Sequence, residues 1–591
     1  MTDSMPGWNG HRLRKAVPAG TKRIRRTALI VAAALAVTAG GLGAGMATAS
    51  ATAAGPTHAG TTGAVIPAAP AGAAAASGLP SRPQQIKVLT AALANMHKNF
   101  KTLNQLIGGE AGPRDVFDYG IGDLWKQGID GAGTTIAVLE GWNYPGITKT
   151  LAELDKVYGL PDPKVTTIFP AGPPPAACPP GMAGLGDYGS CDAWEGELVG
   201  DVISAHLMAP YAKIVISVTP ATSQDDAASQ IAMPEMMKAL EVISSRHLAN
   251  VISISDGTGE ATYPNLAEIL ANDPGELTAA ADGVPVTVAT EDCGVVQPLP
   301  VANALCGHTT PGPDTATWDD SPFVTAVGGT VPHYSDTGRR LGPDTVWNAN
   351  VPGLGRLAEG AGYSEVFKRP AYQNEVAHIT GSPMRSVPDI TADATEGTSE
   401  ATPIIAGILA LATQLNHGHD LGPVNPALYK IGPDGAAAGI IDVTRGNNSV
   451  IGKQGQTLVQ GFTAGPGFDV ATGWGTVYAP RFVPSLVRAT AELGGEAAIK
   501  AQAAAQLNAL EHHAITLAPV PGHSTYLQAG GFLPGHTVTL AIDGKAIATL
   551  HASTLGNVTY MISPALLHLS RGPHALSLGS LLITETARFS S

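Results

Sequence analysis

The stretch TTIAVLE at residues 134–140 is a short apolar run that ends in a carboxylate, and it gives the first indication of the fold. Apolar residues fill its centre without the polar alternation of a half-exposed strand, which is typical of a strand covered on both faces. Three later runs have the same character: AKIVISVTP (212–220), NVISISDG (250–257) and VPVTVAT (284–290). Together they predict the buried strands of one parallel sheet.

Segments with helical character separate these runs. Two of them are EGELVGDVISAHLMA (195–209) and EMMKALEVISSRHL (235–248). Strands that alternate with helices predict an α/β fold in which helices cover both faces of a parallel sheet. In such a sheet, functional side chains stand at the carboxyl ends of the strands, where loops lead into helices.

The N-terminal region predicts export from the cell. Seven Lys and Arg residues lie within 12–26, an Ala-rich apolar stretch follows, and Ala-x-Ala sites occur in ATASATAAG (47–55). Residues 1–53 therefore predict a signal peptide, with a single membrane anchor as the alternative. The pair Arg25 and Arg26 is compatible with twin-arginine export as well as general export. No later stretch is apolar and long enough to span a bilayer, so we expect a secreted protein without a membrane anchor.

Composition divides the rest of the chain into four parts. Residues 54–112 combine an Ala/Gly/Pro/Thr-rich linker with an amphipathic helix over 86–107, which predicts a docking helix or the remnant of a prosegment. Residues 113–490 hold the predicted α/β domain, and 491–514 form a helical linker. Residues 515–591 contain short alternating runs such as HTVTLAIDG and predict a small β-sandwich. This sandwich resembles Ig-like modules of secreted bacterial enzymes, and we expect it to contact a cell surface or a glycan.

Charge and cysteine content limit the classes of partner. Without residues 1–53 the chain has 27 basic and 47 acidic side chains, a net charge of −20, which argues against a nucleic-acid partner. Only 14% of all residues are charged, a composition that fits an acidic medium. The four cysteines predict two short-loop disulfides, Cys178 with Cys191 and Cys293 with Cys306. No C-x-x-C or H-x-x-x-H spacing suggests zinc.

A second informative stretch is EGTSEATPIIAGILAL (396–411), which places Ser399 between a Gly-Thr pair and a long apolar run. Taken alone, Ser399 is a good helix N-cap residue. The alternative is a nucleophile held at a helix start. A serine nucleophile needs a base, and the chain has no HGTH-like histidine motif to supply one. His206, His308 and His378 are expected to be surface or packing residues.

Carboxylates provide another base. Glu197 and Asp201 stand four residues apart, which places both on one face of a predicted helix, and apolar neighbours indicate that much of this helix is buried. A solvated acidic stripe is the alternative. A carboxylate stays partly ionised in acid, where imidazole is protonated and cannot act as a base. Asp292 follows the run VPVTVAT, where a protonated carboxyl could donate to an oxyanion, with a turn residue as the alternative.

The chain resembles the sedolisin family, the serine-carboxyl peptidases with a subtilisin-like fold. Stretches similar to the family follow one another in order over about 375 residues: GAGTTIAVLE (131–140), the Glu197/Asp201 helix with APYAKI (209–214), SISDGTGE (253–260), ATEDCG (289–294), SPFVTAVGGT (321–330), YSEVFKRPAYQ (363–373) and GTSEATPIIAGILAL (397–411). The resemblance implies a subtilisin-like α/β fold and an endopeptidase that cleaves proteins or peptides at acidic pH. It also implies that Ser399 is the nucleophile, Glu197 the general base, Asp201 its orienting partner and Asp292 the oxyanion donor.

The same resemblance implies one calcium ion. The stretches IIDVTRG (440–446) and TAGPGFDVATGWGT (463–476) are similar to the calcium loop of the family. Oxygen ligands and flexible glycines suit Ca²⁺ rather than a transition metal. The implied ligands are the carboxylates of Asp442 and Asp469 and the carbonyls of Val443, Gly465 and Gly467.

Three features depart from the family pattern. Glu400 stands beside Ser399 where a small residue is usual, and Asp256 stands where an aromatic residue is common. Only seven residues separate Asp389 from Gly397, where family members carry an additional hairpin. These departures support an alternative function, a catalytically impaired relative that binds peptides or a surface.

Overall fold

The structure is a computed structural model of the whole chain, and its described part begins at residue 79. The described residues are 79–104, 112–170, 172–174, 191–219, 234–263, 269, 273–299, 306, 309–310, 312–335, 340–351, 355–451, 458–494, 516–520, 524–529, 537–551, 558–565, 567–579 and 584–590. The expected signal peptide, residues 54–78 of the Ala-rich linker and residues 495–514 of the helical linker expected over 491–514 lie outside them. Within the described residues, no helix has both the length and the apolar character needed to cross a membrane.

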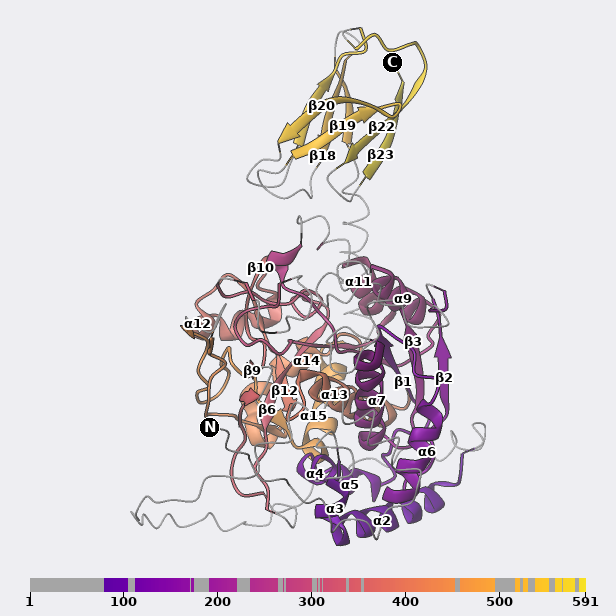
Figure 1. Cartoon of the computed structure of the whole chain (residues 1–591), viewed down its shortest axis with the longest axis vertical. Helices are drawn as coiled ribbons and strands as arrows, with labels where there is room; N and C mark the ends of the chain where they lie inside the picture. Colours follow the sequence, from indigo (N-terminus) through magenta and orange to yellow (C-terminus); the bar gives the residue numbers. More distant parts are fainter. Residues whose placement is uncertain are drawn as a thin grey trace, which may run out of the picture.

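A parallel sheet forms the centre of the α/β domain, as the sequence predicted (Figure 1). Its seven parallel strands lie in the order β12-β6-β5-β4-β1-β3-β2, and β7 (Thr345–Val346) pairs antiparallel with β6. The bounds of the parallel strands are β1 Thr135–Glu140, β2 Val165–Ile168, β3 Lys213–Val218, β4 Val251–Ile254, β5 Val286–Ala289, β6 Thr325–Val331 and β12 Ile390–Asp393. The four predicted apolar runs correspond to β1, β3, β4 and β5.

Successive residues of β1 enter two different cores, because side chains of a strand alternate between the faces of the sheet. Ile136 and Val138 belong to one core, and Ala137 and Leu139 belong to the other. The first core includes residues of α7 (Cys191–Met208) and α13 (Thr398–Leu415), whereas the second includes residues of α9 (Pro234–Ser245) and α11 (Asp273–Asp282). Both faces are therefore covered, as continuous apolar strands require.

The close packing of α13 on α7 depends on Gly407. A Cβ at this position would lie 2.5 Å from Cβ of Met208 and 3.0 Å from the carbonyl oxygen of Ala205. Because one of these atoms belongs to the backbone of α7, the helices could not approach as closely with a side chain at residue 407. The absence of a side chain here brings the face of α7 that carries Glu197 and Asp201 toward the start of α13.

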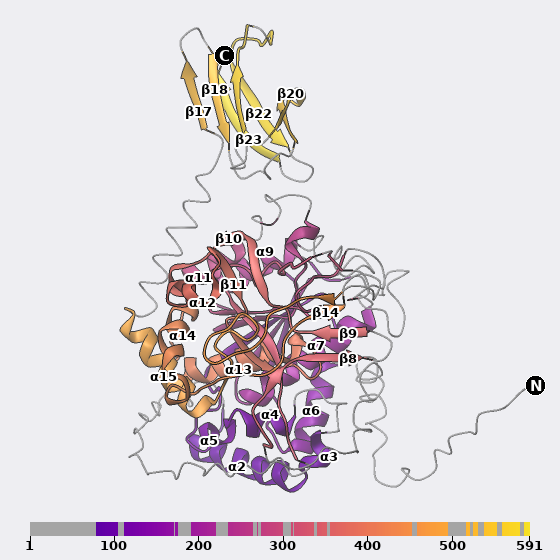
Figure 2. The same cartoon turned by 90° about the vertical axis from the view of Figure 1, so that its left-hand side faces the viewer.

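The expected amphipathic helix over 86–107 is two helices in the structure. α2 (Arg82–Lys98) and α3 (Phe100–Asn104) are interrupted at Asn99, and residues 105–111 lie outside the described part. Leu89 and Met96 are fully buried in the same core as α7 and α13. The segment is therefore an integral layer of the domain, and Figure 2 shows α2 packed beside the helices that follow it. These helices are α4 Pro113–Asp118, α5 Ile121–Trp125 and α6 Ile147–Tyr158.

Shorter elements surround the sheet and complete the domain. The β-strands are paired as β8 Asn348–Val351 with β9 Gly355–Ala358, β10 Gly362–Lys368 with β11 Met384–Val387, β13 Ile440–Ile441 with β16 Thr476–Val477, and β14 Val450–Ile451 with β15 Leu458–Val459. The helical elements are η2 Glu260–Thr262, η4 Ala371–Val376, α12 Ala377–Thr380, α14 Asn425–Ile431, η5 Gly432–Ala437 and α15 Ala479–Glu492.

The C-terminal residues form two antiparallel sheets, β17-β18-β21 and β20-β19-β22-β23. Leu527 and Val558 of the first sheet share one core with Val538, Leu540 and Leu576 of the second, which confirms the expected sandwich. The strands are β17 Thr516–Val520, β18 Ser524–Ala529, β19 Thr537–Ile542, β20 Lys545–His551, β21 Val558–Ile562, β22 Pro573–Gly579 and β23 Thr584–Ser590.

The cysteine and histidine predictions have separate outcomes. Cys293 and Cys306 form the expected disulfide. Cys191 is also disulfide-bonded, whereas Cys178 lies outside the described residues.

His206 is a buried packing residue whose Nε2 lies 2.9 Å from Oδ1 of Asp155, and His378 is exposed. His308 lies outside the described part.

Candidate active site

Helix α7 carries both candidate carboxyl groups, Glu197 and Asp201. Glu197 is half-buried and Asp201 is almost fully buried, one turn apart on the face that the i, i+4 spacing predicted. Ser255, directly after β4, donates from Oγ to Oδ2 of Asp201 over 2.6 Å. The same Ser255 Oγ lies 3.4 Å from the carbonyl oxygen of Ser399. The end of β4 therefore links the acid on α7 to the first turn of α13.

Ser399 lies in the first turn of α13, but it is not the N-cap. The helix begins at Thr398, and Gly397 is the N-cap residue with φ of 116°. The reading of Ser399 as a capping residue is thus wrong, because the positive φ of the turn places a glycine at the boundary. Its half-buried side chain is free of that structural role.

One small cavity unites the candidate triad. Its volume is about 30 Å³, which is enough to hold a water molecule. Glu197, Asp201 and Ser399 all line it, so the structure brings these three sequence-selected residues together. The complete lining is Gly196, Glu197, Gly200, Asp201, Ser204, Glu396, Ser399 and Glu400.

Asp292 lies on the other side of the serine turn, shortly after β5. Its Oδ1 accepts hydrogen bonds from the backbone N–H of Thr398 at 2.9 Å and from the Thr398 hydroxyl at 3.0 Å. A Cβ at Gly397 would lie 2.8 Å from Oδ2 of Asp292, so the glycine also makes room for this carboxyl. The adjacent Cys293–Cys306 disulfide anchors the loop. Burial raises the pKa of Asp292 to about 6 against the lowering effect of the Thr398 donors, which favours a neutral carboxylic acid in mildly acidic solution.

Comparison with known proteins finds relatives of one kind. No family model matches the chain. The chain is 27% identical to kumamolisin of Bacillus sp. (strain MN-32), over 61% of this chain and 62% of that protein. It is 31% identical to sedolisin of Pseudomonas sp. (strain 101), over 41% of each, and 33% identical to human tripeptidyl-peptidase 1, over 28% of this chain and 32% of that protein.

The chain is similar to members of the sedolisin family. A solved structure of Pseudomonas sedolisin, a serine-carboxyl proteinase complexed with pseudo-iodotyrostatin, is 26% identical over 60% of this chain and 92% of that one, with a TM-score of 0.48. The matched region spans less than two thirds of the length of the curated relatives, about 62% for kumamolisin and 41% for sedolisin.

The chain carries another acid at the site, Glu140, to which sequence reasoning gave no role. Glu140 is the last residue of β1 and is 1% exposed, and neither carboxylate oxygen has a hydrogen-bond partner among the described residues. Burial raises its pKa well above the usual value, and the charges of Asp201, Glu197 and Asp256 raise it further. Its signal was present in the sequence, as the charged end of an otherwise apolar central strand.

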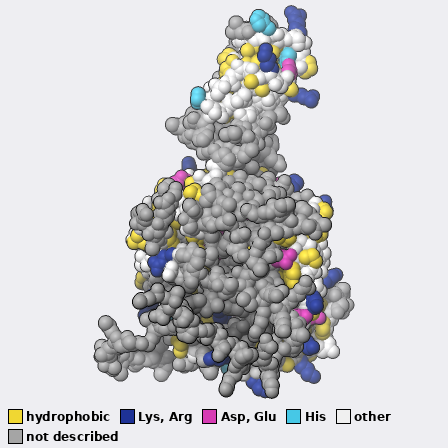
Figure 3. All heavy atoms as spheres, in the orientation of Figure 1, with side chains coloured by type: hydrophobic (Ala, Val, Ile, Leu, Met, Phe, Trp, Pro, Cys, Tyr) yellow, Lys and Arg dark blue, Asp and Glu magenta, His cyan; other side chains and the backbone are white. Residues whose placement is uncertain are grey.

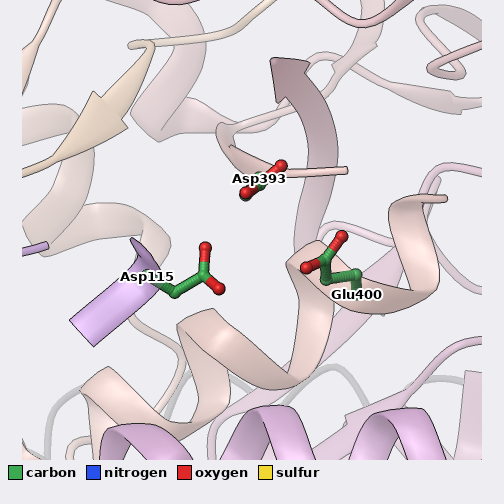
Figure 4. Close-up of side chains that lie close together, drawn as sticks. All are labelled: Asp115, Asp393 and Glu400. Atoms are coloured by element: carbon green, nitrogen blue, oxygen red, sulfur yellow. The ribbon is translucent and has the colours of Figure 1, made fainter. Parts of the chain in front are cut away.

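A second acidic cluster includes Glu400, the residue after Ser399, and is drawn in Figure 4. Carboxyl oxygens of Asp115, Asp393 and Glu400 lie within 4.8 Å of one another, an arrangement that can hold a metal ion. However, the guanidinium of Arg114 contacts all three, at 3.7, 2.7 and 2.8 Å respectively. Because this cation already contacts all three carboxyl groups, we assign no metal to the cluster.

The five candidate calcium ligands lie on two segments that the structure joins. β13 pairs with β16, and the N–H of Gly467 donates to Oδ2 of Asp442 over 2.9 Å. The N–H of Gly465 donates to Oδ2 of Asp469 over 2.7 Å. Burial raises the pKa of Asp469 to about 6, so a cation beside this carboxyl would relieve the cost of its charge. The donor set therefore fits a hard divalent cation.

Proposed function

We propose that the chain is a secreted serine-carboxyl endopeptidase that hydrolyses protein or peptide substrates at acidic pH. One observation carries the proposal: Ser399, Glu197 and Asp201 line the same small cavity, with Asp292 bonded to the residue before the serine. A nucleophile and a proton acceptor beside one space, with an acidic donor bonded to the neighbouring residue, form the minimum set for acyl transfer.

In the proposed mechanism, the Ser399 oxygen attacks the carbonyl carbon of the scissile bond while its proton passes to the Glu197 carboxylate. The carbonyl oxygen becomes an oxyanion, and neutral Asp292 donates a hydrogen bond to it. As the carbon–nitrogen bond breaks, Glu197 returns the proton to the leaving amine, and an acyl-enzyme forms. Water then repeats these steps on the ester and releases the acid. Asp201, held by Ser255, orients Glu197 and can share its proton.

The interior of the α/β domain supports activity in acid. Eighteen carboxyl side chains are buried among the described residues, whereas the only buried Lys or Arg among them is Arg385. Burial raises the pKa of Asp130, Asp314 and Asp319, so these carboxyls favour the protonated form and acid forces no charge change on them. On the face in Figure 3, the coloured Lys and Arg side chains are dispersed. The buried carboxyls are those of Asp115, Asp118, Asp130, Glu140, Asp155, Asp201, Asp256, Glu260, Glu276, Asp314, Asp319, Asp320, Asp344, Glu359, Asp389, Asp393, Glu400 and Asp469.

Calcium belongs to the same proposal as a structural ion. Asp442 and Asp469 would supply carboxylate oxygens, and Val443, Gly465 and Gly467 would supply carbonyl oxygens. The ion would stabilise the two joined segments by mass action, without a part in bond cleavage. Export through residues 1–53, the domain boundaries given above and a surface or glycan contact of the sandwich stay predictions.

An impaired relative that binds peptides is the second candidate function. Only residues 394–397 connect β12 with α13, so this connection adds little wall to a substrate cleft. The retained cavity favours the peptidase, because a binding protein has no need to bury acids beside a serine.

The decisive experiment compares cleavage of a peptide library at pH 4 and pH 7, read by mass spectrometry. We expect cleavage at pH 4 that falls by about 10⁴-fold or more in Ser399→Ala and in Glu197→Gln. Glu195→Gln is the matched control, since Glu195 lies on the same helix but not in the cavity lining. Near-full activity in either of the first two variants would refute the assignment, and peptide binding without cleavage would favour the second candidate.

A further inference from the structure

The turn that carries Ser399 is bridged by a single side chain, that of Glu400. Its Oε2 accepts the backbone N–H of Glu396 over 3.0 Å, and its Oε1 accepts from the guanidinium of Arg114 over 2.8 Å. Glu396 lies three residues before the serine and Glu400 directly after it. The carboxylate therefore closes a ring around the three residues between them, Gly397, Thr398 and Ser399.

Arg114 connects this bridge to the strand that precedes the turn. Its Nε lies 2.7 Å from Oδ2 of Asp393, the last residue of β12. Oδ1 of Asp393 accepts the N–H of Thr395 at 3.0 Å and the Thr395 hydroxyl at 2.7 Å. One guanidinium thus fixes both ends of the connection between β12 and α13, from a helix, α4, that lies far earlier in the chain.

Charge and burial make the pair costly to break. The side chains of Asp393 and Glu400 are 0% and 3% exposed, and that of Arg114 is 12% exposed. Arg114 is the only Lys or Arg that contacts this carboxyl cluster among the described residues. A buried carboxylate that loses its cation either takes up a proton or moves toward solvent, and either change alters its hydrogen bond to Glu396.

We propose that the Arg114–Glu400 pair is a positioning device that holds the 396–399 turn so that the Ser399 hydroxyl faces the cavity shared with Glu197. The inference rests on the proposed peptidase function and adds two positioning residues to it. Neither residue acts on the substrate directly. Their effect reaches the reaction through the orientation of Ser399, for which small displacements have large consequences in rate.

Glu400→Gln tests the device at constant side-chain size, because the amide keeps one acceptor oxygen and loses the other. We expect kcat to fall by about tenfold to a hundredfold with KM within about twofold of the wild type. Arg114→Gln should give a similar loss, and the double variant should lose less than the product of the two single losses, since the Arg114–Glu400 contact is common to both. Arg340→Gln is the matched control. Arg340 binds buried Asp118 on the same helix α4 at 2.8 Å, yet it does not contact the turn.

Amide hydrogen exchange of the peptide that contains residues 393–400 supplies a readout independent of activity. Exchange of the Glu396 amide should be faster in Glu400→Gln and in Arg114→Gln, and unchanged in Arg340→Gln. Unchanged kcat in Glu400→Gln, or equal losses in Arg340→Gln, would overturn the inference. If the wild type cleaves no peptide, the peptidase proposal fails, and the exchange result alone decides whether the pair holds the turn.

Discussion

Asp314 offers a quantitative test of how the fold responds to pH. Its side chain is 6% exposed, and the N–H of Ala261 lies 3.3 Å from its Oδ1. Burial, followed by the charge of Glu260, raises its pKa to about 8. In the unfolded chain an aspartic acid titrates at about 4.

The sign and size of the effect follow from these two pKa values. A raised folded-state pKa means that the protonated carboxyl contributes stability fully below about pH 4, and that this stability is lost as the pH rises toward 8. Between pH 5 and pH 7 the folded state binds about one more proton at Asp314 than the unfolded state does. The free energy of unfolding should therefore fall by about 1.4 kcal/mol per pH unit from this residue alone, or about 3 kcal/mol over the two units.

Asp314→Asn removes this titration while keeping the shape of the side chain. We expect the loss of stability between pH 5 and pH 7 to be about 3 kcal/mol smaller in the variant than in the wild type, measured by urea unfolding. Tryptophan fluorescence reports on the α/β domain alone, because residues 515–591 contain no tryptophan. Asp434→Asn, at an exposed carboxylate, controls for loss of a negative charge. If the free energy of unfolding changed with pH in the same way in the wild type and in Asp314→Asn, the reasoning would be refuted.

Three further predictions concern the site and its supports. Gly407→Ala should lower the free energy of unfolding by about 1–3 kcal/mol and reduce kcat, because the added Cβ meets α7. If the variant were as stable as the wild type in urea unfolding, this close approach would be contradicted. Removal of calcium with a chelator should lower the melting temperature of the wild type but not of Asp442→Asn, and equal shifts in both proteins would argue against the ion site. Activity should fall as the pH rises through about 6, where Asp292 loses its proton. Asp292→Asn should move this limb of the pH–rate profile to higher pH, because an amide stays a neutral donor. A limb that does not move would assign the titration to another group.

Much of the fold could be predicted from the sequence, because the burial of a strand or a helix face fixes which of its positions are apolar. The four continuous apolar runs became β1, β3, β4 and β5, since a strand covered on both faces has no polar side to display. The i, i+4 spacing of Glu197 and Asp201 was equally informative, because helical geometry alone places them together. The Cys293–Cys306 disulfide followed from export and short spacing.

Other features depended on contacts between distant segments. The sequence favoured a cap at Ser399, whereas the turn geometry placed Gly397 at the helix boundary. One continuous helix was expected where α2 and α3 are separated at Asn99, because periodicity does not report a local interruption. Glu140 received no role, since its proximity to Asp201 arises only when β1 and α7 pack.

The sequence by itself determined which residue types were available for acid-based chemistry: a serine after Gly-Thr, two carboxyls one helical turn apart, and a carboxyl after an apolar strand. Only the tertiary structure decided that Glu197 and Ser399, 202 positions apart in the chain, both line one cavity of about 30 Å³. It also decided that Arg114 reaches Glu400 across 286 residues. Local patterns encode periodicity and burial, but a site assembled across a sheet is fixed by packing, which no single stretch of sequence contains.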